Sequence, residues 1–176
     1  VREQAYQVVF KITDEPRFGV KLVTFKTWNI KVIAPKPLWK STALDLVKRQ
    51  AELKWENYGC QNAEFIQVWR KVDSFPFQPT ECQSGIPRFL GYQLITELDP
   101  SATEFTDTNN GKGLVVGAKY CYRLVASFRA PAGGKSYVSS EECLGPIRAD
   151  APVITHVSVE ATSEDEGAIR VSWRSP

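Results

Sequence analysis

The segment YCYRLVASF, residues 120–128, alternates large apolar side chains with other residues. Alternation with a period of two is typical of a β-strand that packs one face on a core. The inward face is then Tyr120, Tyr122, Leu124 and Ala126. The outward face is Cys121, Arg123 and Val125. Because an exposed free thiol is reactive, a cysteine on the outward face predicts a disulfide.

The number and spacing of the cysteines agree with that prediction. The sequence holds four, with no Cys-x-x-Cys spacing: Cys60, Cys82, Cys121 and Cys143. A zinc site needs closely spaced Cys and His ligands, and the one histidine is His156. Two disulfides in an exported protein are therefore expected. Four independent buried thiols are the alternative, and the outward position of Cys121 argues against them.

The pairing follows if residues 120–128 and the segment SYVSSEECL, residues 136–144, form a hairpin that turns near Ala132. Cys121 then faces Cys143, and Arg123 faces Glu141 on the same outer side. An opposite-charge pair of this kind supports the register.

Two further consequences follow from this register. Glu142 would face inward opposite Tyr122, which predicts a bulge near the end of the hairpin. The remaining cysteines, Cys60 and Cys82, would join the loop before the strand EFIQVWRKV to the insertion after it.

Composition narrows the functional class. The chain has 176 residues, 43% of them hydrophobic and 24% charged, as expected for a folded protein. A net charge of +2 with no run of Lys and Arg predicts no nucleic-acid partner. No apolar stretch approaches the roughly 20 residues of a membrane helix, so no membrane insertion is expected. The sequence has no methionine, which suggests a piece of a longer or processed protein.

Strand patterns between turn signals predict an all-β protein in three parts. Residues 1–35 resemble the last hairpin of a preceding sandwich, and residues 36–147 hold seven expected strands. Residues 148–176 resemble the first strands of a following sandwich. Within the middle part, residues 42–53 have partial helical spacing but run into a strand pattern. Trp173 repeats the strand motif of Trp55, 118 residues earlier, as tandem domains would.

The middle part resembles a fibronectin type III domain, an immunoglobulin-like β-sandwich. Trp55 matches the tryptophan of the second strand, and TEFTDT matches the strand before the last hairpin. In LVVGAKYCYRLVA, Leu114, Gly117 and Tyr120 match the leucine, glycine and corner tyrosine of that family. The hydroxyl of such a tyrosine bonds the backbone a few residues upstream. The resemblance implies a structural core that includes Trp55, Leu114, Tyr120, Tyr122 and, in the following domain, Trp173.

A narrower resemblance comes from the phrases NYGCQNAEFIQVWRKVDS, TDTNNGKGL, YCYRLVASF and SSEECLGPI. They are similar to repeats of very large surface proteins of gliding bacteria, exported by the type IX secretion route. The long insertion at residues 73–91 and the four cysteines depart from the general fibronectin pattern and favour this group. The resemblance implies an extracellular spacer and adhesion module on the cell surface. Its partners would be neighbouring domains of the same chain, surface polysaccharide, or secretion and motility proteins.

The sequence gives no sign of an enzyme, a cofactor or a metal site. A hydrolytic triad needs a histidine base, and His156 lies in a strand of an incomplete domain. The loop DTNNGKG, residues 107–113, fails as an EF-hand because Ala118 stands where the bidentate glutamate is required. The Asn110-Gly111 pair is typical of a turn. The acidic loop of Glu164, Asp165 and Glu166 is either solvated or a calcium site.

Exposed aromatic residues are the candidate contacts for a ligand or partner. Since Ile66 and Val68 should face the core, Trp69 is expected to point outward. Phe75 and Phe77 belong to the insertion, which either leaves Trp69 open for binding or folds over it. A third arrangement places a neighbouring Arg123 across the indole ring.

Two other functional classes fit parts of this pattern. The main alternative is an accessory fibronectin-like domain of a secreted polysaccharide-degrading enzyme, with the chemistry elsewhere in the chain. A cytokine-receptor ectodomain also carries paired cysteines, but its Trp-Ser-x-Trp-Ser signature is absent, since VSWRSP has one tryptophan.

Overall fold

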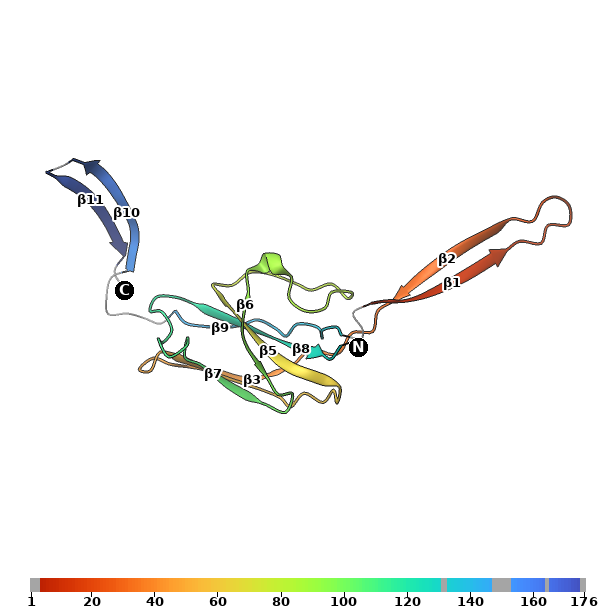
Figure 1. Cartoon of the computed structure of the whole chain (residues 1–176), viewed down its shortest axis with the longest axis horizontal. Helices are drawn as coiled ribbons and strands as arrows, with labels where there is room; N and C mark the ends of the chain where they lie inside the picture. The colour runs from red at the N-terminus through yellow and green to blue at the C-terminus, as the bar shows by residue number, and fades with distance from the viewer. Residues whose placement is uncertain (1–3, 131–132, 147–152, 164, 175–176) are drawn as a thin grey trace.

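The computed structural model describes residues 4–130, 133–146, 153–163 and 165–174 (Figure 1). Regular structure in these residues is almost entirely antiparallel β-strand, so the predicted all-β class is confirmed. The strands before the insertion are β1 (Tyr6–Thr13), β2 (Val23–Ile30), β3 (Trp39–Asp45), β4 (Gln50–Trp55) and β5 (Ala63–Val72). Later come the 3-10 turn η1 (Arg88–Leu90), β6 (Gln93–Leu98), β7 (Glu104–Asp107), β8 (Tyr120–Phe128), β9 (Glu142–Leu144), β10 (Val153–Thr162) and β11 (Gly167–Arg174).

The middle of the chain forms two sheets in a sandwich-like arrangement. One has the order β3-β4-β7 and the other β6-β5-β8-β9. Figure 1 shows the first sheet below the second. Residues 42–53, which have partial helical spacing, form the end of β3, a turn and the start of β4. Seven strands were expected in this part, and the two sheets contain seven.

The core lies between the two sheets and is built from their alternating residues. The predicted inward face of β8 is confirmed, because Tyr120, Tyr122, Leu124 and Ala126 all belong to the buried core cluster. Trp55 is 1% exposed, and its indole N–H donates to the carbonyl of Ala102 at 2.8 Å. Strand β4 therefore contributes the large side chain around which the core packs.

Tyr120 closes the loop that precedes β8. Its hydroxyl accepts a hydrogen bond from the backbone N–H of Val115, five residues upstream, at 3.0 Å. Gly117 in that loop has a φ of 80°, a value that favours glycine. Leu114 before it is fully buried. The loop geometry thus agrees with what the corner-tyrosine motif implies.

The outward face of β8 is covered rather than solvated. Cys121 and Val125 are fully buried and Arg123 is 5% exposed, although all three point away from the core. The insertion of residues 73–91, which contains η1, covers this face of the sheet (Figure 1). The expectation of a strand with one face in water is therefore wrong, because this long loop forms a second buried layer.

The insertion is held in place by bonds to distant parts of the chain. The N–H of Asp73 donates to the carbonyl of Lys119 at 2.8 Å, and the N–H of Gly85 donates to the carbonyl of Ser136 at 2.9 Å. Gly85 has a φ of 70°, and a Cβ there would meet the Lys135 side chain at 2.7 Å. The positive φ favours glycine at this position, and a larger residue would also have to displace the Lys135 side chain.

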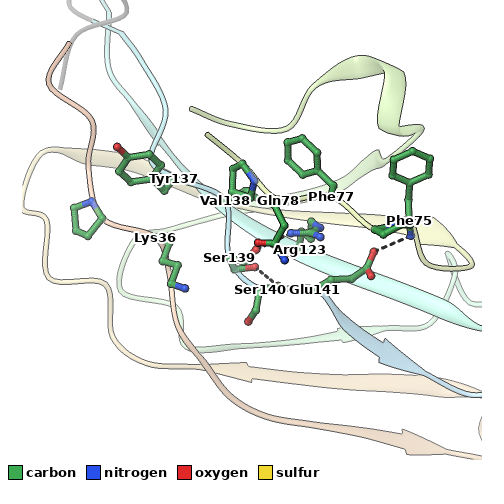
Figure 2. A pocket seen from close by; sticks show the side chains of 13 residues that line it. Lys36, Phe75, Phe77, Gln78, Arg123, Tyr137, Val138, Ser139, Ser140 and Glu141 are labelled. Atoms are coloured by element: carbon green, nitrogen blue, oxygen red, sulfur yellow. Dashed lines mark hydrogen bonds between the residues drawn. The ribbon is translucent and has the colours of Figure 1, made fainter. Parts of the chain in front are cut away.

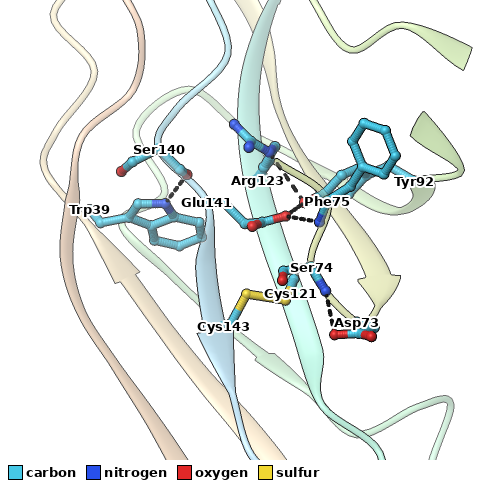
Figure 3. Close-up of a disulfide and its surroundings, with 10 residues drawn as sticks. All are labelled: Trp39, Asp73, Ser74, Phe75, Tyr92, Cys121, Arg123, Ser140, Glu141 and Cys143. Carbon is cyan, nitrogen blue, oxygen red and sulfur yellow. Dashed lines mark hydrogen bonds between the residues drawn. A yellow bond between two sulfur atoms is a disulfide. The ribbon is translucent and has the colours of Figure 1, made fainter. Parts of the chain in front are cut away.

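The last hairpin has the predicted register at its base. Cys121 pairs with Cys143 across β8 and β9, and the two are joined by a disulfide (Figure 3). Tyr122 faces Glu142, as expected. Beyond Glu142 the register shifts, since the N–H of Ser139 donates to the carbonyl of Leu124. The predicted turn position, Ala132, lies outside the described residues.

The second predicted disulfide is not formed, and Cys60 and Cys82 are free thiols. Cys60 packs, half-buried, against the core near Tyr58. Cys82 is exposed in a turn of the insertion, where the N–H of Gln83 donates to the carbonyl of Thr80. The prediction was wrong because sequence spacing does not reveal where a long insertion folds.

The two terminal hairpins are separate two-stranded sheets, β1-β2 and β10-β11. Each carries one apolar face that stays exposed, with Trp28 at 63% and Trp173 at 64%. Trp173 was predicted to be a core residue of a following domain. No other described strand covers the β10-β11 sheet, so that role stays a prediction.

Candidate functional site

The insertion and the last hairpin enclose a groove on the outer side of the four-stranded sheet (Figure 2). Its volume is about 650 Å³. Residues 75–79 of the insertion form one wall and residues 137–141 form the other. Pro35 and Lys36, which precede β3, and Arg123 of β8 complete the lining. This volume falls within the range of about 300–1,000 Å³ that small-ligand sites have.

Arg123 is fixed between the two walls of the groove. Its Nε donates to the hydroxyl of Tyr92 at 3.2 Å, and its Nη1 donates to the carbonyl of Ser139 at 3.0 Å. The guanidinium also lies 5.9 Å from the ring centroid of Phe77 and 5.8 Å from that of Tyr92. Both distances suit cation–π contact. A cation is thus held rigidly in a largely desolvated position.

Glu141 does not form the predicted ion pair with Arg123. Its carboxylate instead accepts hydrogen bonds from the Tyr92 hydroxyl and, at 3.4 Å, from the backbone N–H of Phe75 (Figure 3). The predicted pairing failed because Tyr92, which follows the insertion, places its hydroxyl between the two charged groups. Arg123, Tyr92 and Glu141 therefore form a chain of hydrogen bonds along the groove.

The hydroxyl of Tyr92 keeps its proton in this chain. Burial raises the pKa of Tyr92 above its ordinary value of 10.0, and the hydrogen bond to Glu141 raises it further. The neighbouring Arg123 acts in the opposite direction but less strongly. Tyr92 thus remains a donor to Glu141 and an acceptor from Arg123 across the ordinary pH range.

The structure brings together two of the three predicted contact residues. Phe75 and Phe77 line the groove, and Phe75 is 41% exposed. Trp69 does not line it. Its indole N–H donates to the Gln67 side chain at 3.2 Å, and the ammonium of Lys135 lies 5.5 Å from its ring. The arrangement with Arg123 across this ring is wrong, because Lys135 occupies that place.

A second polar cluster joins the two sheets away from the groove. Nη1 of Arg70 on β5 lies 2.9 Å and 3.1 Å from the two carboxylate oxygens of Asp107 on β7. The same carboxylate accepts from the Tyr122 hydroxyl and from the N–H of Asn109, each at 2.9 Å. Burial raises the pKa of Tyr122 well above its ordinary value, and the nearby Asp107 adds to this. Protein donors occupy both oxygens of this carboxylate, so the role of the cluster is to hold the two sheets together.

Acidic groups elsewhere give no assembled metal site in the described parts of the chain. Cys121, Glu141 and Cys143 bring potential ligand atoms within 4.8 Å, but the two sulfur atoms are bonded to each other. In the acidic loop, the N–H of Glu166 donates to the Ser163 hydroxyl at 2.8 Å and closes a turn. Glu164 of that loop lies outside the described residues.

Sequence reasoning missed Lys36 and Tyr137, which line the groove, and Tyr92, which bonds to Arg123 and Glu141 of the lining. Lys36 lies at the start of the middle part, Tyr137 lies in an expected strand, and Tyr92 lies just before β6. The spacing of aromatic residues on both sides of the insertion was the available signal. It was not specific enough, since aromatic residues at such positions more often fill a core.

Comparison with protein-family models found no match, and comparison with curated proteins found none either. Among the described residues, no helical segment reaches the length and hydropathy that a membrane-spanning helix requires.

Proposed function

We propose that the chain is a non-enzymatic, extracellular structural and adhesion module of a large bacterial surface protein. In this proposal residues 36–147 are a fibronectin type III-like domain of the kind found in gliding-motility proteins exported by the type IX route. Residues 1–35 and 148–176 belong to neighbouring immunoglobulin-like sandwiches of the same chain. The Tyr120 corner and the two-sheet strand order are the structural features that favour this identification.

The observation that best supports a load-bearing role for the domain is the disulfide at the edge of the four-stranded sheet. Strand β9 has three residues, and Cys143 at its centre is covalently bonded to Cys121 of β8. A force applied along the chain from β1 to β11 passes through β9, which would otherwise detach early. The bond keeps the last strand on the sandwich, and disulfides persist in extracellular, oxidising surroundings.

The apolar faces of the terminal hairpins support a serial arrangement. Side chains of β1 and β2 that share one face are large and exposed, with Phe10 at 43% and Trp28 at 63%. Two-stranded sheets are marginal in water unless a further layer covers them. In this proposal, strands of the neighbouring sandwiches in the same longer chain cover these apolar faces.

The side chains at hand favour binding over catalysis. His156 is the one histidine in the sequence, and it lies on β10, in a different sheet from the strands that border the groove. In the groove, Glu141 and Arg123 are both engaged by Tyr92. Among the described residues that line the groove, no serine hydroxyl is hydrogen-bonded to a general base, as acyl transfer or hydrolysis by a serine nucleophile would require.

The test is to stretch the whole chain by its two ends in a single-molecule force experiment. We expect one cooperative unfolding event for the sandwich under oxidising conditions. Under reduction the released length should grow by roughly 75 Å, because 22 further positions along the chain become extensible. Unfolding without a resolvable force, or no length difference on reduction, would count against a load-bearing role.

A further inference from the structure

The groove presents more positive than negative charge to a ligand. Lys36 is exposed at its border and Arg123 lies on its floor. The one carboxylate of the lining is Glu141, which is held by the Tyr92 hydroxyl and the Phe75 N–H. Two cationic side chains therefore line the groove, and its carboxylate, Glu141, already accepts hydrogen bonds from the protein. This charge pattern suits an anionic ligand.

One nitrogen of Arg123 is available to such a ligand. Nε and Nη1 have protein acceptors, whereas Nη2 donates to no acceptor that the structure describes. No buried side-chain nitrogen or oxygen in the described residues lacks a partner, so Nη2 keeps some accessible surface. Arg123 is 5% exposed and lines the groove, and Nη2 is its one guanidinium nitrogen without a protein acceptor in the described residues. A carboxylate there would complete the guanidinium's hydrogen bonds.

The walls of the groove suit a sugar ring better than a peptide. Phe75, Phe77 and Tyr137 supply aromatic rings, on which an apolar ring face can stack. A peptide that binds by adding a strand needs free backbone groups. On the hairpin wall, however, the N–H of Tyr137 donates to Ala34 and the N–H of Ser139 donates to Leu124.

The opposite wall offers few backbone donors, namely the N–H groups of Phe77 and Gln78. Pro76 and Pro79 have no N–H, and the N–H of Phe75 is bonded to Glu141. The side chains of Gln78 and Ser140 remain as polar groups at the border, and Ser140 is exposed. These are suitable partners for hydroxyl groups.

We propose that this groove binds an acidic polysaccharide through a uronate residue. The sugar carboxylate accepts from Arg123 Nη2 and from Lys36, and the ring lies against Phe75. The proposal rests on the adhesion part of the proposed function and names its ligand class. The load-bearing part is independent, since the force experiment above does not involve the groove.

Calorimetric titration of the whole chain with trigalacturonate is the direct test. The fully methyl-esterified trisaccharide is the matched neutral probe, and a hexaglutamate peptide is a non-sugar anion of higher charge. We expect binding of trigalacturonate, with affinity at least roughly tenfold lower for both the ester and the peptide. Lys36→Gln and Phe75→Ala should each weaken binding several-fold, because both side chains border the groove.

Control variants separate the site from general effects of charge and aromatic content. Lys48→Gln removes an exposed lysine outside the groove, and Phe18→Ala removes a phenylalanine that is 94% exposed. Both should bind trigalacturonate like the unchanged chain. Arg123→Lys should abolish most binding, and its thermal unfolding shows whether the fold persists. If it unfolds, Lys36→Gln and Phe75→Ala decide the question.

Three results would overturn the proposal. The first is no binding of trigalacturonate by the folded chain. The second is equal affinity for the methyl ester, since the carboxylate would then play no part. The third is equal or tighter binding of hexaglutamate, which would assign the groove to an acidic peptide. In each case the load-bearing role would still be supported if the single-molecule experiment gave the expected unfolding force and length change.

Discussion

The Cα atoms of Cys121 and Cys143 lie 4.0 Å apart at directly opposed positions of β8 and β9. The bond between these residues encloses the whole turn of the last hairpin and fixes the shortest strand of the sheet. Such a cross-link reduces the conformational entropy of the unfolded chain.

Removal of this bond should destabilise the sandwich. For a closed loop of 22 residues, chain entropy predicts a loss of about 3 kcal/mol in the free energy of unfolding. Urea denaturation of the Cys121→Ala/Cys143→Ala double variant measures it. Cys82→Ser is the matched control and should change stability by less than about 0.5 kcal/mol, because that thiol is exposed and free. A double variant as stable as the original chain would show that the bond contributes nothing to folding.

Asp107→Asn should lower the free energy of unfolding, because it weakens the polar cluster that joins the two sheets. The carboxylate is 5% exposed and pairs with Arg70, which is 18% exposed, so the change leaves a cation with little compensation. Breaking a buried pair in this way costs about 3 kcal/mol. The exposed pair of Lys54 and Glu104 is the control. Glu104→Gln should cost less than about 1 kcal/mol, and equal losses for both variants would contradict the argument.

Tyr120→Phe should cost about 1–2 kcal/mol in the free energy of unfolding, because the N–H of Val115 loses its acceptor. Tyr137→Phe is the matched substitution at an exposed bond, where the hydroxyl donates to the carbonyl of Glu81. Thermal or urea unfolding of the two variants compares them. A larger loss for Tyr137→Phe would mean that the corner bond is not a significant restraint.

Alkaline pH should destabilise the fold. Burial raises the pKa of Tyr58, Tyr92 and Tyr122 above the ordinary value of 10.0. Above about pH 10 the unfolded chain releases these protons while the folded chain retains them, so stability is complete below that pH and falls as the pH rises. Melting temperature and tyrosinate absorbance against pH measure the effect. Tyr122→Phe should make the decline shallower, and an unchanged slope would contradict this.

The sequence predicts the sandwich well because each strand carries its own pattern. Alternation in residues 120–128 predicts which side chains of β8 face the core, and the register of the last hairpin follows from the positions of its cysteines. Both are local properties of the chain. The corner at Tyr120 is also local, since its bond spans five residues.

The candidate site could not be predicted in the same way. The groove depends on where the insertion folds, and that is decided by bonds between residues far apart, such as Gly85 with Ser136. The charge pair of Arg123 and Glu141 failed as a prediction because the Tyr92 hydroxyl, from the segment just before β6, lies between the two groups. The predicted Cys60–Cys82 disulfide failed for the same reason, because it too depended on where the insertion folds.

The covering of β8 by the insertion separates two tasks within one domain. The core residues and the disulfide lie beneath or beside the insertion, whereas Phe75, Phe77 and Gln78 belong to a loop that no strand pairing restrains. Substitutions at the exposed Phe75 and Gln78 should therefore change the lining of the groove with little effect on the sheets, whereas Phe77 also packs against Arg123. Under the proposed adhesion role, domains of this kind in series would differ in the loop that lines the groove while each keeps the same strands and disulfide.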